Sequence, residues 1–297
     1  MAGPIDLSQL PKPEVVEELD YEAILAERKA SLLSRVESGR VQEVEATLER
    51  ESEPLTMLLE ENAYRELVWR KRVNEAARAV MLAYAEGTDL ENLVANSNIE
   101  RHVIREETDD EEAVYESDPD LRSRAQQAWE GLSVAGPRSA YEFHALSADG
   151  DVADATAITP APAEVTITVL SRTGDGSASQ TLLDAVESVL SGEDTRPVGD
   201  RITVQAAEII DYEIDAVLEV EDGPEKDPII EAATANVNEY KNTQRRLGRS
   251  IRRSALFRAL HVEGVRNVVL NAPADDVVLD KTQAGNCTSM TITSGSA

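Results

Sequence analysis

The chain has 297 residues, which is enough for two domains, and 41% of them are hydrophobic. Only 4% are aromatic, so the cores must be built from Leu, Val, Ile and Ala. The formal net charge is −28, and residues 1–150 (net −17) and 151–297 (net −11) are both acidic. This balance disfavours nucleic acid as a partner, because phosphate binding depends on Lys and Arg, and it favours docking on basic protein surfaces.

Residues 1–97 are predicted to form a helical N-terminal region that begins with an extended arm. Prolines and acids over residues 1–20 prevent a helix there, and helical patterns follow over 21–36 and 41–85, the second one restarting at Pro54. Within the last pattern a spacing of 4, 4, 3 and 4 places one stripe on one helix face: Trp69, Val73, Ala77, Val80 and Tyr84. We expect this stripe to pack against another helix, of this chain or of a second chain.

Residues 98–160 are predicted to be an acidic linker followed by a helical hairpin. Between Glu106 and Asp120 there are nine acids and no base. Because like charges repel and stay solvated, a mobile linker is favoured over a dedicated docking segment, and we expect order there only within an assembled particle. Helices should follow from Asp118 and from Ser139.

Residues 161–281 carry the clearest strand and helix patterns. In chain order we expect a strand over 165–170, a helix over 179–190, strands over 202–206 and 210–220, helices over 227–248 and 250–260, and a strand over 265–270. Without the extra helix this is the split βαβ order of a ferredoxin-like α/β sandwich, so the predicted fold class is α+β. Residues 282–297, rich in Thr, Ser and Gly, are expected to be a flexible tail.

Two charged features in this region are candidate interfaces. The strand over 210–220 has apolar residues at its even positions and acids at its odd positions: Asp211, Glu213, Asp215 and Glu219, followed by Glu221. A run of seven bases without an acid, Lys241 to Arg258, includes Arg245, Arg246, Arg249, Arg252 and Arg253. The run is either a helix-end cluster that offsets local acids or an arginine-rich docking patch. The acidic strand and the basic run could join neighbouring copies head to tail into a ring, or neutralise each other within one subunit.

Motifs for catalysis, cofactors or metals are not found in the sequence. His102, His144 and His261 are isolated, and no nucleophile elbow or P-loop occurs. The glycine pair Gly174 and Gly176 lacks the third glycine of a nucleotide-binding turn. The lone Cys287 excludes an intramolecular disulfide framework. The first ten residues do not resemble a signal peptide and no run of about 18 apolar residues occurs, so we expect no membrane association and assembly in the host cytoplasm.

Many short stretches, in a fixed order along nearly the whole chain, carry a family resemblance. In the N-terminal part they are Ile5–Ser8 (IDLS), Glu51–Pro54 (ESEP), Glu61–Glu66 (ENAYRE), Arg72–Ala77 (RVNEAA) and Gly87–Leu90 (GTDL). Further on they are Tyr115–Asp118 (YESD), Gly131–Ser133 (GLS), Tyr141–Ser147 (YEFHALS), Leu170–Gly176 (LSRTGDG), Asp200–Ala206 (DRITVQA) and Gly248–Ser250 (GRS). With these stretches the chain resembles the baseplate J family of contractile-tail phages and R-type tail-like bacteriocins.

The resemblance implies a structural baseplate wedge subunit of the virion tail or tail-like particle, without catalytic residues or cofactors. It implies a smaller wedge partner protein, further copies of the chain, and sheath-initiator and tail-fibre-attachment proteins as partners. Copies from neighbouring wedges would link into a ring around the central hub, and rearrangement of that ring would trigger sheath contraction. The alternative is a general protein-interaction scaffold unrelated to tails.

Overall fold

The computed structural model describes residue 5 and residues 7–108, 111–129, 131, 136–192, 195–220 and 226–296. The chain divides into two compact units, Met1–Glu100 and Arg101–Ala297. The first unit is helical and the second combines helices with small sheets, so the chain belongs to the α+β class, as predicted.

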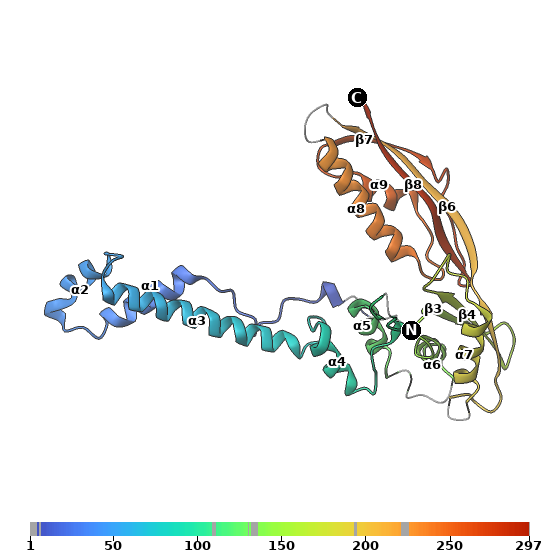
Figure 1. Cartoon of the computed structure of the whole chain (residues 1–297), viewed down its shortest axis with the longest axis horizontal. Helices are drawn as coiled ribbons and strands as arrows, with labels where there is room; N and C mark the ends of the chain where they lie inside the picture. Colours follow the sequence, from blue (N-terminus) through green and yellow to red (C-terminus); the bar gives the residue numbers. More distant parts are fainter. Residues whose placement is uncertain are drawn as a thin grey trace. The chain divides into compact units, whose positions relative to one another are not determined.

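The first unit is built around one long helix. Its elements are η1 (Leu7–Gln9), α1 (Tyr21–Leu33), η2 (Ser38–Arg40), α2 (Val41–Leu48), α3 (Pro54–Ala79) and α4 (Gly87–Ala95). Pro54 opens α3, where its missing N–H costs no helical hydrogen bond. α1 runs beside α3 (Figure 1), and Asp20 caps its first turn by accepting hydrogen bonds from two backbone N–H groups.

A narrow apolar seam and polar ties join α3 to the preceding chain. Ala63, with no exposed surface, packs with Ile24 and Leu25 of α1. The buried side chain of Asn74 accepts a hydrogen bond from the backbone N–H of Glu17 at 3.1 Å and donates to its backbone oxygen at 2.9 Å. The arm expected before α1 is therefore fixed to α3 near its end.

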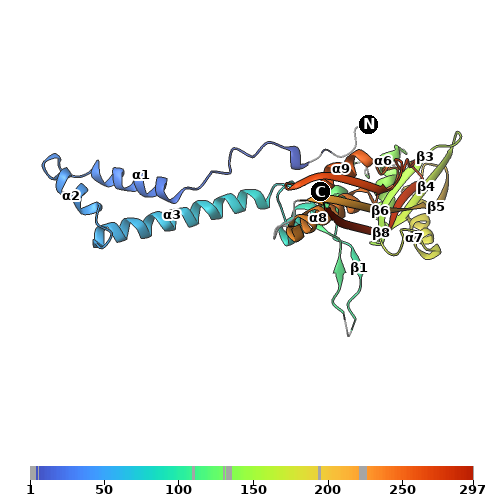
Figure 2. The ribbon, with the colours of Figure 1, turned by 90° about the horizontal axis from the view of Figure 1, so that it is seen from above.

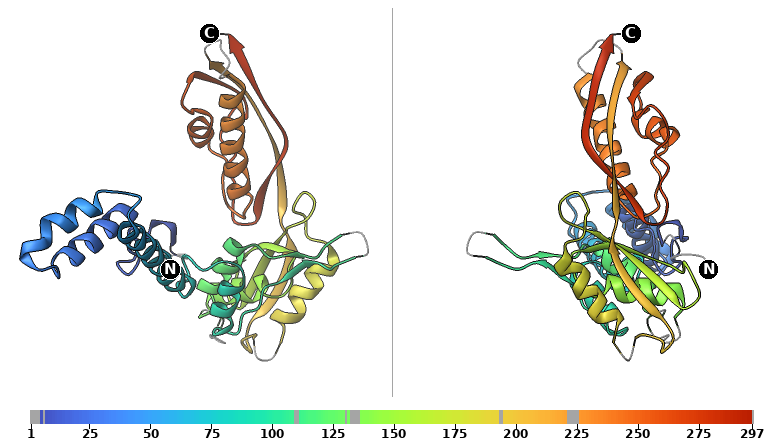
Figure 3. Two further views of the ribbon diagram at one scale, coloured as in Figure 1. Left: turned by 60° about the vertical axis from the view of Figure 1, so that its left-hand side comes forward. Right: turned by 90° about the vertical axis from the view of Figure 1, so that its right-hand side faces the viewer.

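The second unit contains two three-stranded sheets, visible in Figures 1 and 3. Its first elements are β1 (Val103–Arg105), β2 (Val114–Tyr115), α5 (Asp118–Gln126), α6 (Arg138–Leu146), β3 (Val152–Ile158), β4 (Glu164–Ser171) and α7 (Gln180–Leu190). The remaining elements are β5 (Arg201–Ala206), β6 (Glu208–Val220), α8 (Lys226–Gln244), α9 (Arg253–Leu260), β7 (Val265–Ala272) and β8 (Gln283–Ser296). The order in one sheet is β3-β4-β5 and in the other β7-β6-β8.

The single ferredoxin-like sandwich expected from the element order is therefore replaced by two smaller sheets. In the first, β4 is antiparallel to β3 and parallel to β5, with α7 as the crossover between the parallel strands. In the second, β6 is antiparallel to β7 and parallel to β8. Neither β3 nor β8 was predicted from the sequence, and each adds the third strand of its sheet.

One nearly continuous strand joins the two sheets. β5 ends at Ala206 and β6 begins at Glu208, so Ala207 alone separates them. The backbone N–H of Ala207 still bonds to the oxygen of Val169 in β4, at 2.9 Å. The next N–H, that of Glu208, bonds to the oxygen of Thr282 immediately before β8, at 3.0 Å. Pairing therefore passes from one sheet to the other within two residues.

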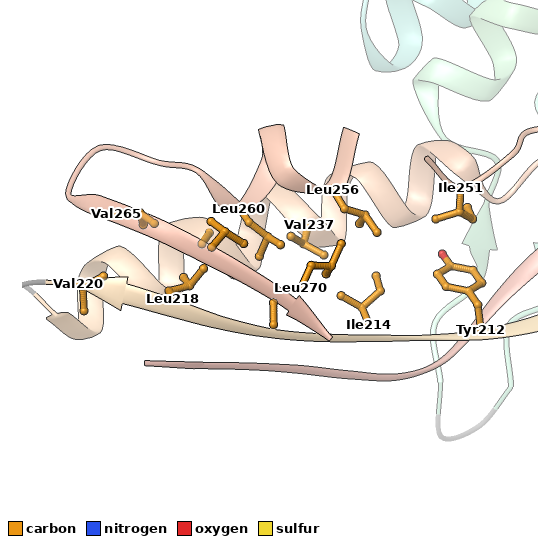
Figure 4. Close-up of a cluster of buried hydrophobic side chains, with 13 residues drawn as sticks. Tyr212, Ile214, Leu218, Val220, Val237, Ile251, Leu256, Leu260, Val265 and Leu270 are labelled. Atoms are coloured by element: carbon orange, nitrogen blue, oxygen red, sulfur yellow. The ribbon is translucent and has the colours of Figure 1, made fainter. Parts of the chain in front are cut away.

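The even-numbered side chains of β6 form the core of the C-terminal sheet (Figure 4). Ile214 and Leu218 have no exposed surface and point toward α8 and α9, as the alternation predicts. Val237 of α8 and Leu260 of α9 complete this core. Both helices therefore cover one face of the sheet, which leaves the odd-numbered side of β6 on the other face.

The flexible tail expected after Lys281 is wrong, because residues 283–296 form β8, paired with β6 along its whole length. The composition of Thr, Ser and Gly suggested a flexible tail. However, Met290 and Ile292 alternate with threonines, and both pack against the core from the sheet edge. A strand at an edge needs few apolar residues, since only one of its faces is partly buried.

Candidate interaction surfaces

Three members of the predicted stripe are exposed in the structure, and the other two, Ala77 and Tyr84, are partly exposed. Trp69 is 70% exposed, Val73 59% and Val80 70%, whereas the face of α3 that packs on α1 carries Ala63. The sequence predicted that the helix and its stripe continue to Tyr84, but α3 ends at Ala79, so Val80 and Tyr84 lie beyond it. Periodicity also could not tell which of two apolar faces meets α1. Exposed apolar side chains gathered on one helix are typical of a protein-binding surface.

A second exposed apolar row lies on another side of the same helix. Met57, Tyr64 and Val68, at spacings of seven and four, are 57%, 60% and 47% exposed. The helix thus presents apolar side chains on more than the face that meets α1. Exposed apolar side chains on two sides of one helix are typical of an element that binds other proteins.

The end of the acidic run is ordered and paired with arginines. Glu116 is only 3% exposed and accepts hydrogen bonds from Arg124 at 3.1 and 2.7 Å, in a bidentate arrangement. Arg101 binds the next acid, Asp118, at 2.6 Å. The solvated linker expected here is not what these residues form, because their charge is balanced by bases outside the run.

The middle of the acidic run belongs to a narrow two-stranded ribbon. β1 and β2 pair antiparallel, and the ribbon extends away from the sheets of the second unit (Figure 2). Arg105 forms an ion pair with Glu111 at 2.8 Å across the ribbon. Asp109 and Asp110, at the centre of the run, lie outside the described residues.

Asp120 links α5 to both sheets of the second unit. Its carboxylate binds Arg172, which follows β4, at 2.5 Å and Arg246, which follows α8, at 2.6 Å. Burial alone would raise the pKa of Asp120, but the two guanidinium groups outweigh this effect, and the pKa lies below its ordinary value. Sequence reasoning missed this network because Asp120 and Arg246 are 126 residues apart.

A second carboxylate at the same junction behaves in the opposite way. Asp154 of β3 accepts a hydrogen bond from the backbone N–H of Leu247 at 2.9 Å. Burial raises the pKa of Asp154, despite the nearby charge of Arg246. The junction between the sheets therefore combines a stabilised carboxylate with one that is costly to ionise.

The first part of the basic run is held against the same unit. Arg246, besides Asp120, donates to the backbone oxygen of Ala153 on β3. Arg245 donates to the backbone oxygen of Gly174 at 2.6 Å and so closes the glycine turn after β4. That turn, considered as a nucleotide site from its two glycines, is a packing feature, since a Cβ at Gly176 would meet Leu170 at 2.8 Å.

The second part of the run fixes the start of α9. Arg253 donates to the backbone oxygens of Leu270 and Pro273, and its guanidinium lies over the Phe257 ring. Arg252 binds Asp276 at 3.0 Å, and the backbone N–H of Arg253, followed by the Arg252 side chain, lowers the pKa of this carboxyl.

Of the seven bases in the run, Arg249, Arg252 and Arg258 are exposed and the other four are partly buried. Arg249 is exposed and bonds to the backbone oxygen of Thr243, and the Arg252 side chain is 51% exposed. In the part of the chain that the structure describes, none of the bonds formed by the five candidate arginines reaches an acid of β6. The two charged features do not neutralise each other there.

The acids of β6 form a row on the open face of the C-terminal sheet. Asp211 and Glu213 are exposed and Asp215 is partly exposed. Alternate residues of a strand are about 7 Å apart, so these carboxylates repel one another along the row. Two amide side chains bind acids of the row: Asn286 donates to Asp211 at 2.7 Å and Asn271 to Asp215 at 3.0 Å. Glu221, which the pattern also assigns to the row, lies outside the described residues.

Neither a metal site nor a membrane-spanning helix is found in the residues that the structure describes. Among the described residues, no cluster of three His, Cys, Asp or Glu side chains could hold a metal ion. Within the same residues, none of the helices has the length and apolar character required to cross a bilayer. The exposed apolar stripe and the carboxylate row are features of a protein that acts by binding other proteins.

Comparison with known proteins shows which family the chain belongs to. The Baseplate J-like N-terminal domain matches residues 51–108, the Baseplate J-like central domain residues 133–206, and the Baseplate J-like protein C-terminal domain residues 212–293. Baseplate protein J of Escherichia phage P2 is 56% identical over 295 residues, which is 98% of each chain. The chain belongs to the Baseplate J-like family. It is a structural component of a phage baseplate and not an enzyme.

Proposed function

We propose that this chain is a wedge subunit of a contractile-tail baseplate. Its copies join a smaller wedge partner protein, link into a ring around the central hub, and rearrange to trigger sheath contraction. The chain is assembled into the tail in the host cytoplasm, where it also meets sheath-initiator and tail-fibre-attachment proteins. The observation that carries the proposal is the apolar surface of α3, which a protein working alone would not expose.

Three candidate surfaces serve these contacts in the proposal. The stripe Trp69, Val73 and Val80 takes an apolar helix of a partner. The row Asp211, Glu213 and Asp215 faces a basic surface of a neighbouring subunit. Among the arginines, those with exposed side chains, Arg249 and Arg252, are the ones able to contact a neighbour, whereas Arg245, Arg246 and Arg253 hold the fold together.

The stripe is tested with the triple variant Trp69→Ala, Val73→Ala and Val80→Ala, co-expressed with the other baseplate proteins of its phage. Because the side chains are exposed, the midpoint of thermal unfolding should stay within a few degrees of wild type. Co-purification of the wedge partner should fall at least tenfold, and electron microscopy should show no complete baseplates. Complete baseplates that contain the variant would contradict the proposal.

The other apolar row of α3 supplies the matched control. Met57→Ala, Tyr64→Ala and Val68→Ala remove a similar amount of exposed apolar surface from the same helix. Partner binding retained in this control and lost in the stripe variant would assign the contact to the Trp69 side of α3.

A further inference from the structure

β8 is an edge strand with an unusual composition. It runs for 14 residues, Gln283–Ser296, and pairs with β6 on one side only. The strand contains no Lys, Arg, Asp, Glu or Pro, although 29% of the chain is charged. Edge strands usually carry charges or prolines, or are short, because their unpaired N–H and C=O groups otherwise attract another strand.

The other sheet edges of the second unit are short or already covered. At the β3 edge, Arg246 occupies the backbone oxygen of Ala153, and the hydroxyl of Thr156 donates to the oxygen of Lys281 at 2.6 Å. At the β7 edge, Arg253 occupies the oxygen of Leu270, and the strand has eight residues. β5 has six residues. A bulge at Thr288 and the bond from the backbone N–H of Gly248 to the oxygen of Gln283, at 2.9 Å, protect the first part of β8. Among the described strands, the part of β8 from Met290 to Ser296 is the edge without such protection.

The side chains of β8 suit a second strand beside it. Ser289, Thr291 and Thr293 are exposed on the open face, where cross-strand hydroxyl pairs stabilise antiparallel strands. On the opposite face, Met290 and Ile292 pack against the core but remain partly exposed at its margin. A neighbouring strand with the same alternation would cover these two side chains and extend the core.

We propose that β8 pairs antiparallel with β8 of a second copy of this chain, so that the two C-terminal sheets form one six-stranded sheet. The proposal rests on the proposed baseplate role and specifies how copies of the subunit contact each other. A twofold axis between the strands makes the contact self-complementary, and neither strand brings a charge to it.

Charge repulsion between two copies is smaller in this placement than in one that joins the open faces. Each copy carries a net charge of −28, with an acidic row along β6. In the order β6-β8-β8-β6 the two rows lie three strand spacings apart, about 14 Å. This exceeds the Debye length of about 8 Å at physiological ionic strength, so their repulsion is largely screened. Two copies that met through the open faces themselves would bring the rows into direct contact.

The first test uses sedimentation equilibrium on the purified full-length chain. Thr291→Lys with Thr293→Lys places two positive charges on the edge of each copy, so that four like charges would meet where the strands pair. We expect self-association to weaken at least tenfold, although the substitutions reduce the net negative charge. The control Asn267→Lys with Val269→Lys adds the same charges to β7, at the other edge of the sheet, and should leave association unchanged.

Each other outcome of this test overturns the proposal. A wild-type chain that stays monomeric up to about 100 µM would show that β8 does not pair with itself. Equal losses in the variant and the control would place the contact on the open face instead of the edge. If the lysine pair abolishes binding of the smaller baseplate partner while the wild-type chain alone is monomeric, the edge receives a strand of that partner.

The second test uses disulfide formation to locate the twofold axis. In a Cys287→Ser background, single cysteines replace residues 289 to 294 one at a time. Antiparallel pairing brings one position opposite its own copy, within the Cα separation of roughly 4.4–6.8 Å that a disulfide spans. Cross-linking should therefore peak sharply at one position, and a uniform rate along the strand would exclude paired β8 strands. Loss of edge pairing with normal co-purification of the wedge partner would leave the baseplate role intact.

Discussion

Asp120 is the residue on which the most distant parts of the second unit depend. Its carboxylate holds Arg172 at the end of β4 and Arg246 before α9, and these arginines also bind backbone oxygens of the segments beside them. The three side chains keep 18%, 22% and 32% of their surface exposed. Water therefore reaches the network. Its contribution to the free energy of unfolding lies between that of a surface ion pair and that of a buried one.

Asp120→Asn should lower the free energy of unfolding at pH 7 by about 2 kcal/mol, less than the roughly 3–5 kcal/mol of a fully buried pair, because water reaches the two arginines. The folded state holds the pKa of Asp120 below its ordinary value of 3.8, so below pH 4 the unfolded chain binds more protons. The stabilisation is present above the unfolded pKa and is lost as the pH falls through the folded pKa.

Urea unfolding at pH 7 and at the lowest pH where both proteins fold should therefore show the difference between wild type and variant shrinking with acidity. Glu187→Gln, which neutralises an exposed carboxylate on α7, is the control and should change stability by less than about 0.5 kcal/mol. A difference that is constant with pH would exclude the ionised carboxylate as its source.

At the scale of elements, β5 and β6 form one nearly continuous strand that couples the two sheets. Its backbone bonds change partner between Ala207 and Glu208, and Ala207 is buried with Leu170, Leu247 and Ala284 at the junction. A strand that is continuous through both sheets transmits a displacement of one sheet to the other, which a flexible linker would not do.

Ala207→Pro should disconnect the sheets. Proline removes the N–H that bonds to Val169 and leaves a buried oxygen unpaired, which costs about 1–3 kcal/mol. Ala207→Ser keeps the N–H and should cost less. Hydrogen exchange should show faster opening of both β4 and β8 in the proline variant only. Unchanged protection in these strands would show that the continuous strand does not couple them.

Sequence patterns predict central strands better than edge strands. β6 was predicted because a central strand with one buried face keeps a strict alternation, as Ile214 and Leu218 show. β3 and β8 were missed because edge strands built from Ala, Thr, Ser and Gly lack a continuous apolar row. The acidic run was misjudged for a different reason. The bases that pair with it lie outside the run, just before or after it for Glu111, Glu116 and Asp118 and far along the chain for Asp120, so a count of charges within the run does not include them.

At the scale of the whole molecule, acidic charge is spread over both units. Residues 1–100 carry 21 acids and 11 bases, and residues 101–297 carry 36 and 18. Copies of such a chain repel each other at low ionic strength, so contacts between copies need surfaces without charge. The strand β8 and the apolar stripe of α3 are such surfaces, whereas the β6 acids suit a partner that is basic.

The effect of salt on self-association therefore distinguishes uncharged contacts from contacts between opposite charges, because salt strengthens association through the first and weakens it through the second. Raising NaCl from 0.1 to 1 M shortens the Debye length from about 10 to about 3 Å. Self-association through β8 should tighten several-fold, because the repulsion between copies is screened and backbone hydrogen bonds are not ionic. At 0.1 M, Asp211→Asn with Glu213→Gln and Asp215→Asn should tighten it more than Glu22→Gln with Glu45→Gln and Glu49→Gln, which change the net charge equally but lie in the first unit. Sedimentation equilibrium across the salt series measures both effects. Self-association that weakens with salt would instead mean that oppositely charged patches join the copies, with Arg249 and Arg252 as the first residues to reverse.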